Sequence, residues 1–319
     1  MKIIVTGGSG LVGENLKLII PNYTEHTFTF INRSKNDEYT IDLTDNSQVI
    51  DFFQKNQFDY IIHLAANVGG LYKNLKNNIN IFRDNIRINE NVLEACHKNN
   101  IQRGIFCLSS CIFPHNPSKF PMDETMICES EPHPSNSGYS NAKRMMYFQC
   151  DNYNRIHNRE YICVVPVNLY GPFDNFNIND GHIIPAIIHR FHLNKINNEK
   201  YICYGSGKPF RQFLYVKDFV IIICKILFNE CNYNSIKPII ISSDYEDTIY
   251  NIILEISTSM NIDKSKLIWD KSKSDGCMRK TVSNNIFKEN FKDYKFISLT
   301  DGLEETYNWF INNYDICRK

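Results

Sequence analysis

The stretch KIIVTGGSGLVG, residues 2–13, carries the strongest signal for the fold. A bare apolar run over residues 2–6 ends at Gly7, Gly10 and Gly13, and an apolar helical pattern follows through about Ile20. Glycines at this spacing allow a tight turn and let the backbone approach a pyrophosphate at the helix N-terminus, where free N–H groups and the helix dipole favour an anion. The stretch therefore predicts a strand, a dinucleotide-binding turn and a helix; the alternative is an ordinary tight turn.

Outward from this turn, short apolar runs alternate with helical patterns through the first half of the chain. We expect helices over 81–98 and 139–156 and strands over 27–32, 59–66, 104–110 and 160–171. Continuous apolar runs suit strands that are buried on both faces of a parallel sheet. The alternation predicts an α/β fold with a doubly wound parallel sheet, the Rossmann arrangement.

The pattern loosens after Gly171. A helix over about 182–195, a strand over 237–242 and a closing helix remain recognisable. Ser298 and Asp301 are placed as a capping box at the start of that last helix.

The chain contains no internal repeat and no low-complexity linker that would mark a domain boundary. We predict that residues 1–170 form a dinucleotide-binding domain and that residues 211–230 return to it. Residues 171–319 are expected to form mainly a smaller C-terminal α/β lobe that binds substrate.

Composition argues against several classes of function. Lys plus Arg equals Asp plus Glu at 35 each, and no basic block stands out, so binding to nucleic acid or to an anionic membrane surface is not indicated. Apolar runs such as FVIIICKILF, residues 219–228, are too short to span a bilayer. The first residues, MKIIVTGG, lack the pattern of a signal peptide.

The eleven cysteines are scattered and include no CxxC pair, so no zinc or other metal site is predicted. Scattered thiols in a chain of this size fit a reducing compartment. We therefore expect a cytoplasmic protein.

The end of the second predicted strand indicates which dinucleotide binds. An acidic residue there would hydrogen-bond the ribose diol of NAD, but the sequence reads INRSK, with Arg33 in that place and Lys35 nearby. A guanidinium can pair with a 2′-phosphate, so we predict NADP(H); the alternative for Arg33 is a solvated loop charge. Asp42, in IDLTD, is placed either to contact the adenine amine or to cap a helix.

Tyr139 and Lys143, in GYSNAK, lie four residues apart and so project from one face of the predicted helix. An ammonium beside a phenol stabilises the phenolate, so we expect a lowered pKa for Tyr139. Such a tyrosine can exchange a proton with a carbinol oxygen near neutral pH. Ser109, or its neighbour Ser110, ends the preceding strand in CLSSCIFP and completes the set.

These motifs, in this order, resemble the extended short-chain dehydrogenase/reductase family over nearly the whole chain. The resemblance implies that Ser109 binds a substrate carbonyl and that HLAANVGG and PVNLYGP line the cofactor. It also implies the cofactor contacts Gly7, Gly10, Leu11, Val12, Gly13, Arg33, Asp42, Leu64, Ala65, Ala66, Lys143, Pro166, Asn168, Leu169 and His182.

Cys111 is the most informative residue for the reaction. Dehydratases of the family carry a Thr-Asp-Glu triplet near this strand end, whereas this chain has Ser109, Ser110 and Cys111. A thiolate can remove a proton from a carbon beside a ketone because the resulting enolate is stabilised. His182, at the start of a predicted helix, can return the proton from the other side. The alternatives are a small buried filler for Cys111 and a helix cap for His182.

The ensemble of motifs is closest to family members that act on GDP-4-keto-6-deoxy-D-mannose. These enzymes epimerise C3 and C5 of the sugar and then reduce C4 with NADPH. The resemblance implies that Arg190 and Arg211 pair with the diphosphate and that Asp275 contacts the sugar or the guanosine ribose. Tyr204 stands where the family often has tryptophan, and Arg190 has the alternative of a surface charge.

Two other functions remain open from the sequence. One is a reductase of a UDP- or dTDP-linked 4-keto sugar, and the other is a catalytically silent NADP-binding subunit. The complete Ser109, Tyr139 and Lys143 set argues against the silent subunit. The resemblance also implies a homodimer formed by the helices at 82–99 and 139–156.

Overall fold

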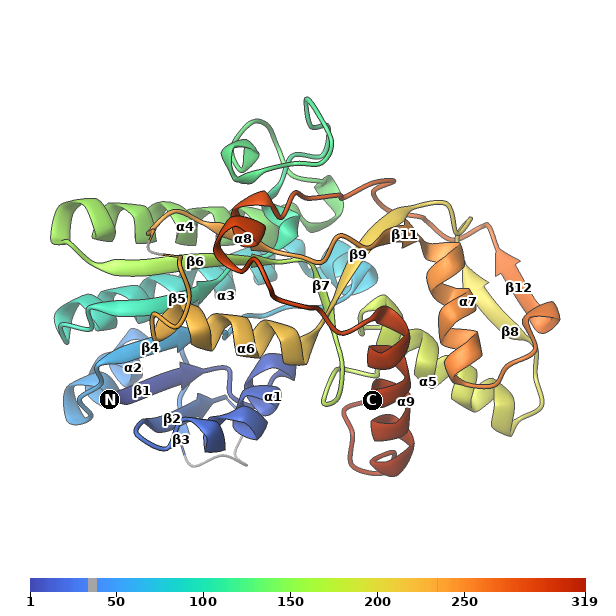
Figure 1. The fold of residues 1–319 in the computed structure, drawn as a ribbon, viewed down its shortest axis with the longest axis horizontal. Coiled ribbons are helices and arrows are strands. Elements are labelled where there is room, and N and C mark those ends of the chain that lie inside the picture. The colour runs from blue at the N-terminus through green and yellow to red at the C-terminus, as the bar shows by residue number, and fades with distance from the viewer. Residues whose placement is uncertain (34–38, 234) are drawn as a thin grey trace.

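The computed structural model describes residues 1–33, 39–233 and 235–319, so Lys35 lies outside the described residues. A seven-stranded sheet forms its centre, in the order β10-β6-β5-β4-β1-β2-β3, and every pairing within it is parallel (Figure 1). Its strands are β1 (Lys2–Thr6), β2 (Thr27–Asn32), β3 (Tyr39–Thr40), β4 (Tyr60–His63), β5 (Arg103–Cys107), β6 (Glu160–Pro166) and β10 (Ile239–Ile241). The doubly wound parallel sheet is therefore confirmed.

Helices cover both faces of this sheet. On one face α3 (Leu71–Lys98) packs along α4 (Ser137–His157), and α2 (Asn46–Lys55) lies against α3. On the other face α1 (Leu11–Ile19) packs along α6 (Val216–Leu227) (Figure 1). Because both faces are covered, the strands are apolar throughout, as in the fully buried Ile3, Ile4 and Val5 of β1.

A second, smaller group of elements lies beyond the carboxyl ends of the strands, to the right in Figure 1. It contains a three-stranded sheet in the order β11-β9-β7 and a two-stranded sheet of β12 and β8. These strands are β7 (Asn168–Tyr170), β8 (Tyr201–Tyr204), β9 (Phe210–Tyr215), β11 (Glu246–Thr248) and β12 (Leu267–Asp270). Helices α5 (Ile183–Ile196), α7 (Ile249–Ser259) and α9 (Leu299–Asn312) enclose a separate hydrophobic cluster with them.

Short elements complete the chain. Helix α8 (Asn285–Asn290) lies beside β10, and its Phe287 belongs to the core of the large sheet. The 3₁₀ turns are η1 (Ile20–Asn22), η2 (Ser110–Ile112), η3 (Glu124–Met126), η4 (Pro134–Asn136) and η5 (Lys264–Lys266). None of the described helices is both long enough and apolar enough to cross a membrane.

Several expected boundaries were wrong: the strands expected over 59–66 and 104–110 end at His63 and Cys107, and two other elements differ more. The single strand expected over 160–171 is two strands, because the chain leaves the large sheet after Pro166 and β7 pairs with β9 instead. The helix expected over 81–98 begins at Leu71, and its polar first turns contain non-helical backbone at Asn77, so apolar periodicity did not reveal them.

The chain passes between the two groups more than once. Helix α6 packs against α1 as expected for a segment that returns to the first group, but β9, which precedes it, belongs to the three-stranded sheet. Strand β10 also returns to the large sheet. The division at residue 170 stays a prediction.

Candidate active site

The glycine turn is packed tightly against the end of β4. Gly7 has a φ of +75°, and a Cβ there would lie 2.8 Å from the backbone nitrogen of Ala65, so a larger residue would be strained and would clash. The Asn32 side chain accepts a hydrogen bond from the Ser9 N–H at 2.6 Å, which ties the turn to the end of β2. Gly10 then begins α1 by accepting from the Glu14 N–H at 2.9 Å.

A cavity of about 550 Å³ opens above this turn, at the carboxyl ends of the parallel strands. That position is where open α/β sheets bind ligands. All of the predicted cofactor contacts except Gly13 line it: Gly7, Gly10, Leu11, Val12, Arg33, Asp42, Leu64, Ala65, Ala66, Lys143, Pro166, Asn168, Leu169 and His182. Gly13 is instead a packing position, because a Cβ there would overlap the backbone of Gly8.

The far end of the cavity carries the residues expected to determine whether NAD or NADP binds. Arg33 is exposed at the end of β2 and lines the cavity. Asp42 accepts from the Thr44 N–H at 3.0 Å and from its hydroxyl at 2.7 Å, and these bonds lower the pKa of Asp42. Asp45, not Asp42, caps α2, so the capping alternative for Asp42 was wrong.

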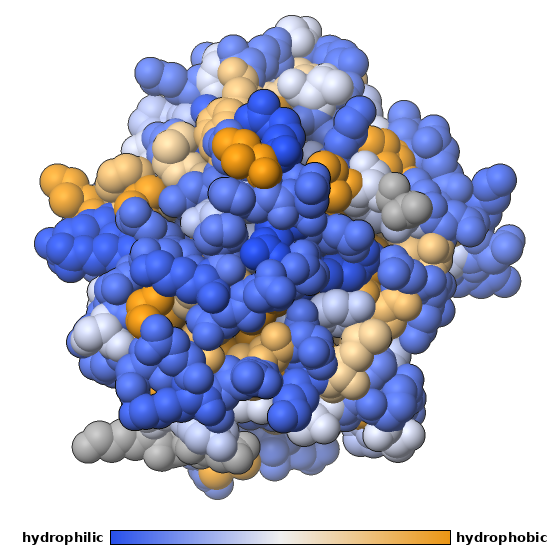
Figure 2. Space-filling model, turned by 90° about the vertical axis from the view of Figure 1, so that its left-hand side faces the viewer, coloured by the Kyte–Doolittle hydropathy of each residue, from blue (hydrophilic) through white to orange (hydrophobic). Residues whose placement is uncertain are grey.

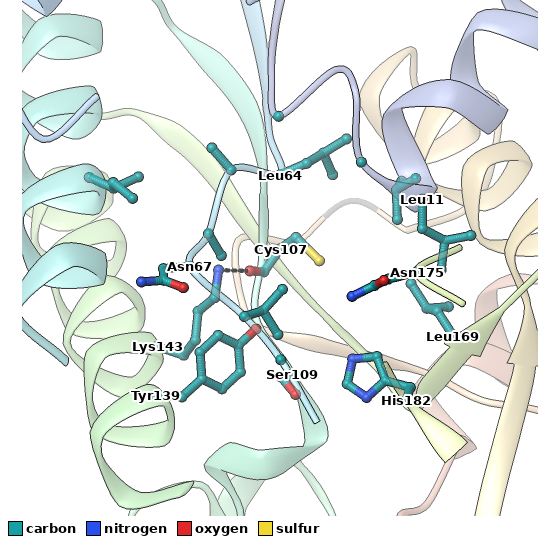
Figure 3. Close-up of a pocket in the computed structure, with 18 of the residues that line it drawn as sticks. Leu11, Leu64, Asn67, Cys107, Ser109, Tyr139, Lys143, Leu169, Asn175 and His182 are labelled. Carbon is teal, nitrogen blue, oxygen red and sulfur yellow. Dashed lines mark hydrogen bonds between the residues drawn. The ribbon is translucent and has the colours of Figure 1, made fainter. Parts of the chain in front are cut away.

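Tyr139 and Lys143 stand side by side on α4, facing the cavity (Figure 3). The Lys143 ammonium is almost fully buried, donates to the Cys107 carbonyl at 2.7 Å, and lies 5.9 Å from the centre of the Tyr139 ring. Burial lowers the pKa of Lys143. Burial also raises the pKa of Tyr139 well above its usual value, against a smaller opposite effect from the hydrogen-bonded Ser109 hydroxyl. The expected lowering of the Tyr139 pKa is therefore wrong for this geometry, because desolvation outweighs the nearby ammonium.

Ser109 and Cys111 come to the cavity on one short turn. Ser109 lies two residues after β5, in extended backbone, and its hydroxyl accepts from the Cys111 N–H at 3.3 Å, which begins η2. Ser109 and Cys111 are half-buried, whereas Ser110 is buried. Cys111 lines both this cavity and its neighbour, which argues against its alternative as a core filler.

His182 lies on the opposite wall of the cavity from Tyr139 and Ser109 (Figure 3). It occupies the N-cap position of α5, but its side chain makes no capping hydrogen bond, so the alternative of a capping side chain was wrong. The His182 side chain is exposed and lines the cavity. Burial, and to a smaller extent the charge of Lys280, lower the pKa of His182, which makes the neutral imidazole the main form at pH 7.

A second cavity of about 280 Å³ shares Cys111 and His182 with the first and extends into the smaller group of elements. All four predicted substrate contacts, Arg190, Tyr204, Arg211 and Asp275, line it. The Arg190 guanidinium lies 3.9 Å from the centre of the Tyr204 ring, a cation–π pair. Arg190 is therefore part of the cavity wall, in contrast to its alternative as a surface charge.

Asp275 and Arg211 also have structural partners. The Asp275 carboxylate accepts from the Ser206 N–H at 2.6 Å and from its hydroxyl at 2.7 Å, so it holds the glycine loop before β9. Arg211 donates to the Cys277 carbonyl at 2.6 Å, which keeps its guanidinium at the cavity rim.

Among the cavity residues that sequence reasoning missed, two bear on the chemistry. Lys280 lines the second cavity and donates to the Cys111 sulfur at 3.6 Å. Asp174 lines the first and is buried; burial raises its pKa to about 7, and its Oδ2 has no hydrogen-bond partner among the described residues. Asp174 lies in GPFDNF, directly after the PVNLYGP motif, so its place in the sequence could have predicted a position at the cavity. Lys280 had no local signal.

The glycine turn lies at the carboxyl ends of a parallel sheet, and a serine, a tyrosine and a lysine line the cavity beside it. These features define a dinucleotide-dependent oxidoreductase of the short-chain type. The family model described as "NAD dependent epimerase/dehydratase family" matches residues 3–236. The chain belongs to this family.

Curated relatives match along the full length. A GDP-L-fucose synthase of Dictyostelium discoideum is 40% identical, with 99% of this chain and 97% of the relative covered. A GDP-L-fucose synthase of Escherichia coli is 30% identical, with 98% of both covered. Among solved structures, a GDP-L-fucose synthetase of Naegleria fowleri bound to NADP has a TM-score of 0.89 and 33% identity, covering 100% of this chain and 95% of that one.

Proposed function

We propose that the protein converts GDP-4-keto-6-deoxy-D-mannose to GDP-L-fucose, by epimerising C3 and C5 and then reducing the C4 ketone with NADPH. The observation that carries the proposal is the pairing of two chemistries at one cavity. A serine, tyrosine and lysine set suited to carbonyl reduction stands beside Cys111 and opposite His182. Full-length relatives that carry the name of this activity support the same reaction.

The residues at the far end of the first cavity fit NADP(H). Arg33 lines that end, and the residue before it, Asn32, is an amide that is already engaged with the turn. A guanidinium there suits the 2′-phosphate. Lys143, Asn168 and Leu169 would flank the nicotinamide end, and the bound cofactor supplies the hydride for C4.

Cys111 and His182 are assigned to the epimerisation. The Cys111 thiolate takes the proton from the carbon beside the ketone, and the electron pair of the broken C–H bond moves to the ketone oxygen. His182, in its protonated form, which is the minor form at pH 7, then donates a proton to the opposite side of the same carbon, and the carbonyl re-forms. Two groups on different walls of the cavity can serve opposite sides of one sugar ring.

Tyr139 and Ser109 are assigned to the reduction. Ser109 orients the ketone oxygen by a hydrogen bond, and the Tyr139 hydroxyl donates its proton to that oxygen as C4 is reduced. The raised pKa of Tyr139 keeps the phenol protonated, which suits a proton donor in this direction. Lys143, held by the Cys107 carbonyl, supplies the positive charge that offsets the phenolate left behind.

The second cavity is assigned to the GDP moiety. Arg190 and Arg211 supply two positive charges for a diphosphate, and Tyr204 offers a ring face for the nucleotide. Asp275 is placed near a ribose, although its carboxylate also holds Ser206.

Product analysis tests the proposal directly. The protein is incubated with GDP-4-keto-6-deoxy-D-mannose and NADPH, and the sugar nucleotide is identified by NMR. GDP-L-fucose formation with matched NADPH oxidation supports the proposal. Oxidation only with a UDP- or dTDP-linked 4-keto sugar would reject the GDP substrate, and tight NADP binding without turnover of any sugar would favour the silent subunit.

We also propose that the protein is a cytoplasmic homodimer. All eleven cysteines are free thiols, which fits a reducing compartment. Phe82 on α3 and Met145 and Phe148 on α4 expose 39–40% of their surface on two helices that pack side by side. By contrast, the end of the molecule seen in Figure 2 is mainly hydrophilic, with separate apolar spots. Light scattering should give a dimer for the wild type and for the control Leu18→Lys on α1, and a monomer for Phe148→Lys.

A further inference from the structure

Lys280 points its ammonium at the proposed base. Its Nζ donates to the Cys111 sulfur at 3.6 Å, and the side chain is half-buried at the second cavity. Among the described residues no carboxylate forms an ion pair with Lys280, although many other lysines and arginines of the chain have one. The Lys280 ammonium therefore contacts the Cys111 sulfur and forms no ion pair with a carboxylate among the described residues.

The backbone around Lys280 is held from two sides. The Phe210 N–H of β9 donates to the Met278 carbonyl at 2.9 Å, and the Met122 N–H donates to the Thr281 carbonyl at 2.9 Å. The neighbouring Arg279 is engaged with Glu246 at 2.8 Å. Lys280 thus extends from a fixed segment, and its approach to Cys111 does not depend on a loose loop.

The other charged or titratable groups near this sulfur and Lys280 come from four parts of the chain. Arg211 of β9 interacts with Cys111 electrostatically, so a second cation lies near the thiol. Tyr139 of α4 also interacts electrostatically with Cys111, and the Tyr139 phenol is neutral at pH 7 because burial raises its pKa. His182, before α5, is mainly neutral because burial and Lys280 lower its pKa. His133, before η4, also has its pKa lowered by burial and by the Lys280 charge.

We propose that Lys280 is a positioning residue that directs the Cys111 sulfur into the substrate cavity and stabilises negative charge on it. Lys280 and Arg211 place two cations near the sulfur, with Asp275 on the wall of the same cavity, and the hydrogen bond from Nζ fixes the direction of the sulfur. This inference extends the proposed function, because it assumes that Cys111 is the base.

The first test uses the free enzyme and needs no substrate. The rate of Cys111 alkylation by iodoacetamide is followed by peptide mass spectrometry from pH 6 to pH 10. Lys280→Met should slow alkylation at pH 7 by about tenfold, and its rate should approach that of the wild type at the highest pH, where the thiol is ionised in any case. Lys280→Arg, which keeps the charge, and the exposed control Lys271→Met should stay within about twofold of the wild type.

A second test follows solvent deuterium exchange at C3 and C5 of the keto sugar at saturating concentration. Lys280→Met should lower the exchange rate at pH 7 by about the same factor as the alkylation rate, with thermal unfolding measured to verify that the variant folds. An alkylation profile identical to that of the wild type overturns the inference, as does a rise in KM with an unchanged exchange rate at saturation. If Cys111→Ser keeps normal exchange, the proposed base is wrong, whatever the alkylation profile of Lys280→Met.

Discussion

The residues proposed for the reduction and those proposed for the epimerisation are positioned in different ways. Ser109, Tyr139 and Lys143 come from one strand end and the helix that follows it, so one β-α unit of the large sheet positions all three. Cys111 shares that strand end, but His182 and Lys280 come from segments that meet it only when the smaller group of elements packs against the sheet. The comparison teaches that reduction depends on a local unit, whereas the epimerisation site depends on the joining of two hydrophobic clusters.

Tyr139→Phe should separate the two halves most clearly. The change removes the proton donor but leaves the buried ring, so reduction of the ketone should fall about a thousandfold. Exchange of deuterium at C3 and C5 should continue, because Cys111 and His182 are untouched. NADPH oxidation and NMR of the sugar measure the two steps in one sample. Full turnover in this variant would contradict the role of Tyr139.

Cys111→Ser is the reciprocal change. The weakly acidic serine hydroxyl is a poor base, so exchange at C3 and C5 should fall by about a hundredfold or more, with reduction limited to unepimerised ketone. His182→Gln should show the same loss of exchange if acid and base act on the same carbons. Exchange at the wild-type rate in Cys111→Ser would remove the thiol from the mechanism.

Arg33→Ser tests the cofactor end of the sheet. Losing a charged contact to the 2′-phosphate should raise the KM for NADPH about ten- to 150-fold, since hydrogen bonds to charged groups contribute about 1.5–3 kcal/mol. The KM for NADH should hardly change, because NADH lacks that phosphate. The control Lys17→Met, on α1, should affect neither cofactor. An equal rise in KM for NADPH and NADH would mean that Arg33 supports the loop and does not bind the 2′-phosphate.

The buried His63 of β4 makes the stability of the large sheet depend on pH. His63 is fully buried, between the Thr6 hydroxyl at 2.7 Å and Asn89 at 3.2 Å, and burial lowers its pKa to about 3. The unfolded chain therefore binds a proton below pH 6.5 that the folded chain excludes, and stability falls as the pH drops from 6.5 toward 3. This contribution is about 1.4 kcal/mol per pH unit.

Urea unfolding at pH 7, 6 and 5 measures that slope. His63→Gln should be less stable than the wild type at pH 7, because it disturbs two buried hydrogen bonds, but should lose less stability on acidification. The same pH slope in both proteins would place the acid-sensitive group elsewhere.

Much of the large sheet could be predicted because its signals are local. Strand β1, the turn from Gly7 and helix α1 follow from one uninterrupted stretch, and buried parallel strands need apolar residues along their whole length. The i and i+4 spacing of Tyr139 and Lys143 follows from the helix period. The break after Pro166 was missed, since β7 is as apolar as a continuation of β6 would be and only its pairing with β9 distinguishes the two.

By itself the sequence determined the parallel α/β arrangement, the dinucleotide turn and the spacing of the residues proposed for the reduction, because backbone geometry and side-chain period act over a few neighbouring residues. Tertiary structure alone decided that Lys280 meets the Cys111 sulfur, that His182 faces Tyr139 across a cavity, and that burial raises the Tyr139 pKa. Those features depend on which distant segments pack together and on how much water they exclude, and neither quantity is encoded in local spacing.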